Sequence, residues 1–358
     1  MSPFPDIYVG ATRGLFVARH VNGRYVPTLL GRLPVDASAR TTDSALQIMF
    51  RGSRTQAVTA DMPKGGFIAD PRSPGRLYVG TEAAGVFRSE DGGATWVPDS
   101  SGLGSLRIWS LVQHPITGVL YAGTEPAALY RKHPGATEWT PCTPFTTLPR
   151  YREWTSPNPP RHEPRVRGIG LDPERPQAIA AAIEEGWLVL SLDGGVTWTN
   201  LTEGSDFDSH SVLFAPGQPQ VLLSTSGDGF YRSDDGGAHF RPSHTGLEGR
   251  YLSPLVLHPA RPRTLYAYCT RNYPPSWFQP GAGAEGAFFR SDDQGGHWRR
   301  IGNTPLIPGG CWTACGDPRE PETFCAGLTD GSVWLTRDGG KQVEPILEGL
   351  GLVSVVSI

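Results

Sequence analysis

The chain has 358 residues, a formal net charge of −3 and a hydrophobic share of 38%. This balance gives no electrostatic reason to expect nucleic acid or an anionic membrane surface as a partner. No apolar run approaches the length of a membrane span, and the first residues, MSPFPDIYVG, show no basic region followed by an apolar one, so we expect a cytoplasmic protein.

Turn-forming residues are frequent, with 45 glycines and 34 prolines spread between short apolar runs. This distribution predicts many tight turns rather than disorder. The five cysteines are odd in number in a large chain, so we expect free thiols rather than a disulfide framework. No motif predicts a cofactor.

Short β-strands are predicted along the whole chain. The first segment, IYVGATRGLFVARHVNGRYVPTLL, alternates apolar and polar residues and predicts three strands. Residues 30–64 show no clear repeat. From about residue 65, each unit reads as a strand, an Asp-Pro or His-Pro type of turn, a strand, a glycine-containing loop, a strand, a second turn and a last strand. The chain ends in a lone apolar strand, LVSVVSI.

One eight-residue segment recurs at the second turn of these units. Its copies are SEDGGATW, SLDGGVTW, SDDGGAHF, SDDQGGHW and the degenerate TRDGGKQV, and HPGATEW is a further degenerate copy. The copies lie roughly 43 residues apart in three steps and roughly 58 in two, which fits four-stranded blades with insertions.

The repeat predicts an all-β fold, a seven-bladed β-propeller in one domain over residues 1–358. Six units follow residue 65, and the first segment supplies three strands of a seventh. The C-terminal strand then completes the N-terminal blade and closes the ring, which removes exposed sheet edges. Insertions at about 30–64, 140–164 and 271–286 all fall on one face.

The recurring Ser-x-Asp-x-Gly-x-Thr-Trp pattern resembles the Asp-box, or BNR, repeat of the sialidase-like superfamily. The run PPRHEPRVRGIGLDP is similar to uncharacterised bacterial single-propeller BNR-repeat, glycosyl-hydrolase-like proteins. The resemblance implies a propeller but no known reaction, because this fold supports unrelated chemistries. We expect each box aspartate to hold its own turn, although a metal or catalytic role is an alternative.

Function is expected on the face with the insertions, where the first strand of each blade begins and the second ends. Charged and aromatic residues occupy equivalent places there in several blades, and a closed ring brings such places around one axis. The catalytic candidates are Glu82, Glu125, Glu184, His210 and Tyr251. The candidates for substrate binding are Arg13, Trp109, Arg165, Arg167, Arg271 and Trp312. An alternative metal site would combine His162, His210 and Glu185.

Two classes of function stay open. The first is a polar small-molecule ligand, carbohydrate-like for instance, bound or processed by a hydrolase or lyase at the mouth of the central channel. The second is a protein-interaction scaffold with Trp154, Trp277 and Phe278 as exposed anchors. The chain has no Arg-Ile-Pro motif near its start, so sialidase activity is not expected.

Overall fold

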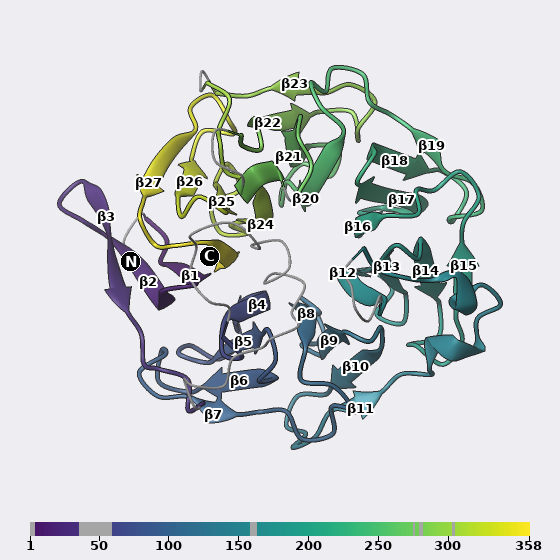
Figure 1. The fold of residues 1–358 in the computed structure, drawn as a ribbon, viewed down its shortest axis with the longest axis horizontal. Helices are drawn as coiled ribbons and strands as arrows, with labels where there is room; N and C mark the ends of the chain where they lie inside the picture. Colours follow the sequence, from purple (N-terminus) through teal and green to yellow (C-terminus); the bar gives the residue numbers. More distant parts are fainter. Residues whose placement is uncertain (1–3, 36–58, 158–162, 275, 279–281, 303–304) are drawn as a thin grey trace.

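The fold is a ring of seven four-stranded antiparallel sheets (Figure 1). A computed structural model describes residues 4–35, 59–157, 163–274, 276–278, 282–302 and 305–358. The seven-bladed all-β architecture predicted from the repeat is confirmed.

The blades follow one another along the chain, each running from its innermost to its outermost strand. Blade 1 contains β28 (Val353–Ser357), β1 (Ile7–Ala11), β2 (Gly14–Val21) and β3 (Arg24–Leu29). Blade 2 contains β4 (Pro63–Ala69), β5 (Leu77–Thr81), β6 (Val86–Ser89) and β7 (Val97–Pro98). Blade 3 contains β8 (Ile108–Gln113), β9 (Leu120–Thr124), β10 (Leu129–Lys132) and β11 (Thr140–Pro141). Blade 4 contains β12 (Arg165–Leu171), β13 (Ile179–Glu184), β14 (Leu188–Ser191) and β15 (Thr199–Leu201).

The last three blades keep this order. Blade 5 contains β16 (Ser209–Ala215), β17 (Gln218–Ser226), β18 (Gly229–Ser233) and β19 (Arg241–Pro242). Blade 6 contains β20 (Tyr251–Leu257), β21 (Leu265–Thr270), β22 (Gly286–Ser291) and β23 (Arg299–Arg300). Blade 7 contains β24 (Cys311–Gly316), β25 (Phe324–Leu328), β26 (Val333–Thr336) and β27 (Glu344–Leu347).

The two ends of the chain share blade 1, as predicted. β28 pairs antiparallel with β1, with Val356 opposite Val9. The Val356 N–H donates to Thr313 Oγ1 of blade 7 at 2.9 Å, and Ser354 Oγ donates to the Pro63 carbonyl of blade 2. The C-terminal strand therefore joins three blades.

The repeated box is a self-contained turn. Ser89 Oγ donates to Asp91 Oδ1 at 2.8 Å, and the other Asp91 oxygen accepts from Thr95 Oγ1 at 2.6 Å. Gly92 and Gly93 have φ of 72° and 90°, a conformation that glycine adopts freely. Asp193, Asp235, Asp293 and Asp338 hold their turns with the same kind of contacts.

The residue that ends the box packs between neighbouring blades. Trp96 is 6% exposed and lies in a cluster with Leu15 and Val355 of blade 1 and Phe67 of blade 2. Trp298 meets Phe230 of blade 5 with ring centroids 5.1 Å apart. The repeat thus builds both the turns and the interfaces between the blades.

The insertions bury several of their aromatic residues, among them Phe145, Trp154 and Trp277. Residues 145–147 and 151–153 form short 3-10 helices, and Phe145 contacts both Trp154 and Trp198. Trp154 and Trp277 are each 7% exposed, so the expectation that they form exposed anchors is wrong. The predicted insertion at 30–64 lies mostly outside the described residues. Along the described part of the chain, no helix is long and apolar enough to cross a membrane.

Candidate functional site

A cavity of about 550 Å³ lies at the ring centre, and the innermost strands of all seven blades line it. Residues from two insertions, Pro157, Tyr273 and Pro274, add to its wall. The cavity therefore opens on the face that the sequence indicated. Its volume is typical of sites for small molecules.

Every innermost strand carries a register shift near its beginning. The residues left without a partner in the neighbouring strand are Lys64–Gly66, Trp109, Arg167, His210, Ser253–Pro254, Trp312 and Ser354. All of them line the cavity. A β-bulge adds one or more unpaired residues to a strand and re-aims their side chains. The seven bulges therefore turn one residue or one short segment from each blade toward the same cavity.

Buried ion pairs begin on the side of blade 2. Lys64 Nζ lies 2.6 Å from Glu82 Oε2, and the two side chains are 7% and 2% exposed. Burial lowers the pKa of Lys64, and Glu82 opposes this shift. Two cations contact the indole of Trp109, with Lys64 Nζ 3.1 Å and the Arg165 guanidinium carbon 3.9 Å from its ring centroids.

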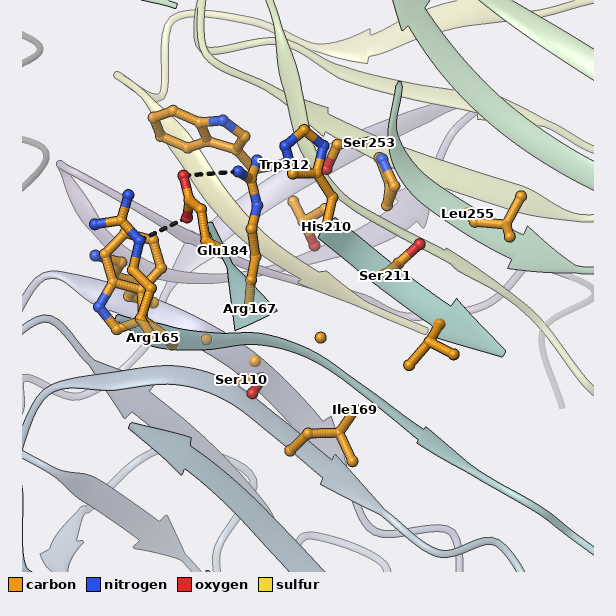
Figure 2. Close-up of a pocket in the computed structure, with 18 of the residues that line it drawn as sticks. Ser110, Arg165, Arg167, Ile169, Glu184, His210, Ser211, Ser253, Leu255 and Trp312 are labelled. Atoms are coloured by element: carbon orange, nitrogen blue, oxygen red, sulfur yellow. Dashed lines mark hydrogen bonds and ion pairs between the residues drawn. The ribbon is translucent and has the colours of Figure 1, made fainter. Parts of the chain in front are cut away.

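Two arginines of β12 share one carboxylate (Figure 2). Glu184 Oε2 accepts from Arg165 Nε at 2.5 Å, and its other oxygen lies 3.0 Å from Arg167 Nη1. Burial opposes the charge on Glu184, but the two guanidinium groups outweigh it and hold the pKa of this carboxyl well below its usual range. Glu184 is therefore a fixed anion that orients both arginines.

The opposite side of the mouth carries a tyrosine, a histidine and an aspartate. Arg167 Nη2 donates to Tyr251 Oη at 2.8 Å. The His210 ring lies 4.5 Å from the Tyr251 ring, with Nδ1 2.7 Å from the Leu252 carbonyl and Nε2 3.2 Å from Asp208 Oδ2. Burial raises the pKa of Tyr251. Burial also acts on Asp208, but His210 outweighs it and the pKa of Asp208 is lowered.

The predicted residues divide into three groups. Seven of them line the cavity, namely Trp109, Arg165, Arg167, Glu184, His210, Tyr251 and Trp312. Glu82 and Glu125 are buried behind it, where Glu82 holds Lys64 and Glu125 contacts Arg107 at 3.2 Å and Arg165 at 3.5 Å. They position cations rather than meet the cavity.

The third group lies away from the cavity lining. Arg13 is exposed, and its guanidinium donates to the Gly349 carbonyl. Arg271 is half-exposed and binds Glu248 at 3.2 Å. Both guanidinium groups bind partners close by. Arg13 and Arg271 therefore stay outside the cavity, although they occupy the same position in their repeats as residues that line it.

The cavity lining also contains residues that were not predicted, among them Lys64, Asp208, Ser253 and Ser354. Lys64 falls within a predicted insertion, and Ser354 in the closing strand. Asp208 directly precedes β16, so its place next to the predicted His210 was the one available signal.

The predicted metal alternative has only two described members. Glu185 lines the cavity at a φ of 53°, His210 also lines it, and His162 lies outside the described residues. Within the described ranges, no group of three His, Cys, Asp or Glu residues is placed to hold a metal ion.

Comparisons with known proteins reveal the fold alone. No family model and no curated protein matches the chain. The GH74 xyloglucanase from Xanthomonas campestris is similar, with a TM-score of 0.62 and 17% identity over 82% of this chain. The GH74 enzyme of Niastella koreensis gives 0.60 and 18% over 80%. This chain spans about half of both, 46% of each.

A third similar structure is YCF48 from Cyanidioschyzon merolae. Its TM-score is 0.52, with 14% identity over 80% of this chain and 87% of that one. The chain thus has a propeller fold found both in glycoside hydrolases and in a protein of another kind.

Proposed function

We propose that the protein binds a polar, hydroxylated small molecule, carbohydrate-like in chemistry, at the mouth of its channel. We also propose that it is a single-propeller member of the Asp-box repeat proteins. The observation that carries the first proposal is the set of bulges. Each innermost strand turns a residue into one cavity, and Lys64, Trp109, Arg167, His210 and Trp312 are among them.

The charges in the mouth favour an uncharged ligand. Lys64 is paired with Glu82, and both Arg165 and Arg167 contact Glu184. An anionic ligand would compete with these buried carboxylates and approach the ionised Asp208. A hydroxyl group, by contrast, can accept from Tyr251 and donate to a carboxylate. The aromatic residues Trp312 and Tyr273 offer flat surfaces to a sugar ring.

Binding is better supported than hydrolysis. A glycoside hydrolase of the two-carboxylate type needs one carboxylic acid that is protonated near neutral pH, which requires a raised pKa. The pKa values of Glu184 and Asp208 are shifted the other way. Tyr251 has a raised pKa, so it remains a neutral phenol, which suits a hydrogen-bond donor better than a nucleophile.

The scaffold alternative has less support. It relied on exposed aromatic anchors, and Trp154 and Trp277 are buried. Tyr273 is 48% exposed and stays available on that face. A similar structure is described as YCF48 bound to D1 peptide, with a TM-score of 0.50 and 14% identity, so a peptide partner is the second candidate.

Calorimetric titration tests the proposal. Wild type and Arg167→Met are titrated with methyl glucoside, methyl galactoside, methyl xyloside, cellobiose and N-acetylneuraminate. We expect at least one neutral saccharide to bind, and Arg167→Met to weaken it at least tenfold. Arg271→Met is the matched control, since Arg271 lies outside the cavity. The proposal is overturned if no neutral saccharide binds, or if both variants bind like wild type.

A further inference from the structure

The chemistry of the cavity changes with depth. Most of the charged and aromatic groups come from the bulges and from the beginnings of the innermost strands, and Glu184 comes from the end of β13. The position directly after the bulge holds Ser110, Ser211 and Thr313 in blades 3, 5 and 7, but Leu255 and Val355 in blades 6 and 1. In blade 4 this position is Gly168, and in blade 2 it is Phe67, which packs in the core and does not line the cavity. The second level therefore carries three hydroxyl and two aliphatic side chains.

The hydroxyl groups at this level are engaged by the protein itself. Ser110 Oγ donates to the Val166 carbonyl at 2.8 Å, and Ser211 Oγ lies 2.6 Å from Thr225 Oγ1. Thr313 Oγ1 accepts from the Val356 N–H at 2.9 Å. These contacts link strands and neighbouring blades, so the hydroxyls do not depend on a ligand to be satisfied.

The deepest level is apolar. The residues that line the cavity beyond the second level are Val112, Ile169, Val212 and Leu213. They follow the bulge by two or three positions, which is roughly 7–10 Å along a strand at ~3.3 Å per residue. Figure 2 shows Arg165, Glu184 and Arg167 gathered at one end of the cavity, with Ile169 and Leu255 at the other.

We infer that the ligand is an amphiphile, with an uncharged hydroxylated head at the mouth and a short apolar tail in the channel. This inference rests on the proposed function and narrows its ligand class. A freely soluble sugar would leave the aliphatic level in contact with water only. An alkyl or aryl group on the sugar would bury that surface, which is the favourable term in such a site.

A chain-length series tests the inference. Methyl, butyl and hexyl β-glucosides are titrated below their micelle concentrations, and the same alkyl galactosides follow if the glucosides do not bind. We expect affinity to rise by roughly fourfold per methylene at first, the factor for ~0.8 kcal/mol per buried CH₂ at ~1.4 kcal/mol per decade. The rise should level off once the tail fills the channel.

Two variants address the channel wall directly. Val112→Thr keeps the side-chain shape and replaces one methyl group by a hydroxyl, and Leu213→Phe narrows the channel. Both should flatten the chain-length dependence, which is expressed for each variant relative to its own methyl glycoside affinity. Leu192→Thr is the matched control, because Leu192 is 61% exposed and lies on an Asp-box turn outside the cavity. Circular dichroism confirms that each variant is folded.

The possible failures are distinguishable. Equal affinity for methyl and hexyl glycosides overturns the amphiphile and leaves the proposed function intact. An unchanged chain-length dependence in both folded channel variants also overturns it, because the tail then lies elsewhere. If no glycoside of any length binds, the proposed function itself fails. Hexanol serves as a head-free probe, and binding as tight as that of hexyl glucoside would contradict recognition of the head.

Discussion

Arg167 Nη2 donates to Tyr251 Oη at 2.8 Å, although 84 residues and the whole of blade 5 separate the two in the chain. Glu184 contacts the same guanidinium at 3.0 Å. Since Tyr251 accepts this hydrogen bond, its own O–H remains a donor. Burial raises the pKa of the phenol, so the donor persists at neutral pH.

Tyr251→Phe should therefore weaken a bound neutral glycoside by about tenfold, the size expected for one lost hydrogen bond of ~1.4 kcal/mol. The ring stays in place, so its packing against His210 and Trp277 is kept. Calorimetric titration gives the affinity and urea unfolding the stability. Tyr130→Phe is the control, because Tyr130 lies outside the cavity lining. An unchanged affinity in Tyr251→Phe would exclude the phenol as a ligand donor.

Substitutions of the buried ion pair Lys64–Glu82 should have strongly non-additive effects on the free energy of unfolding. Removing one partner leaves the other charge buried, which typically destabilises by ~3–5 kcal/mol, whereas replacing both with apolar residues is often close to neutral. Lys64→Met and Glu82→Leu should each lower the free energy of unfolding by about that range. The double variant should recover most of the loss.

Urea unfolding of the four proteins at pH 7 measures this cycle. Nearly additive losses in the double variant would mean that the two charges are not coupled. In that case the buried charge of Lys64 would be stabilised mainly by its contact with the Trp109 ring, whose centroid is 3.1 Å from Nζ.

The sequence predicted the blades and most of the mouth because both depend on position within a repeat. Trp109, Arg167, His210 and Trp312 were found in this way, since each stands at the beginning of an innermost strand. The repeat could not show that these are bulge residues, because a register shift depends on pairing with the neighbouring strand. The repeat also could not distinguish Glu184, which lines the cavity, from Glu82 and Glu125, which do not line it.

Residues outside the repeat explain the other differences. Lys64 reaches the cavity because three residues are skipped between Pro63 and Phe67. Trp154 is buried because its insertion packs on Phe145 and Tyr151. Such contacts depend on tertiary packing, and composition alone does not predict them.

The box aspartates predict a loss of stability in acid. Hydrogen bonds from Thr95, together with one from Ser89, lower the pKa of Asp91 from 3.8 to about 2, and those from Thr197 and Ser191 do the same for Asp193. Because the folded pKa is depressed, the unfolded chain binds more protons between pH 4 and 2. The contribution is complete above about pH 4 and is lost as the pH falls toward 2.

Urea unfolding midpoints measured between pH 6 and pH 2.5 test whether this stabilising contribution is lost as the pH falls. We expect Asp91→Asn and Asp193→Asn to be less stable than wild type at pH 6 and to approach it as the pH falls. Glu320→Gln, at an exposed position outside the boxes, is the surface control. A constant gap between wild type and the Asp variants over the whole range would contradict an ionised box.

Deleting residues 352–358 should abolish folding rather than merely weaken it. β28 is the innermost strand of blade 1, and its loss exposes the edge of β1 and removes the contacts of Val356 with Thr313 and of Ser354 with Pro63. An unpaired edge is prone to association with other chains. We expect the truncated protein to be aggregated or unfolded by size-exclusion chromatography and circular dichroism.

A matched control restores the strand at the other end, through a flexible linker before residue 4, and should recover a monomeric, cooperatively unfolding protein. A soluble truncated chain with an unchanged melting curve would show that ring closure does not hold the propeller together.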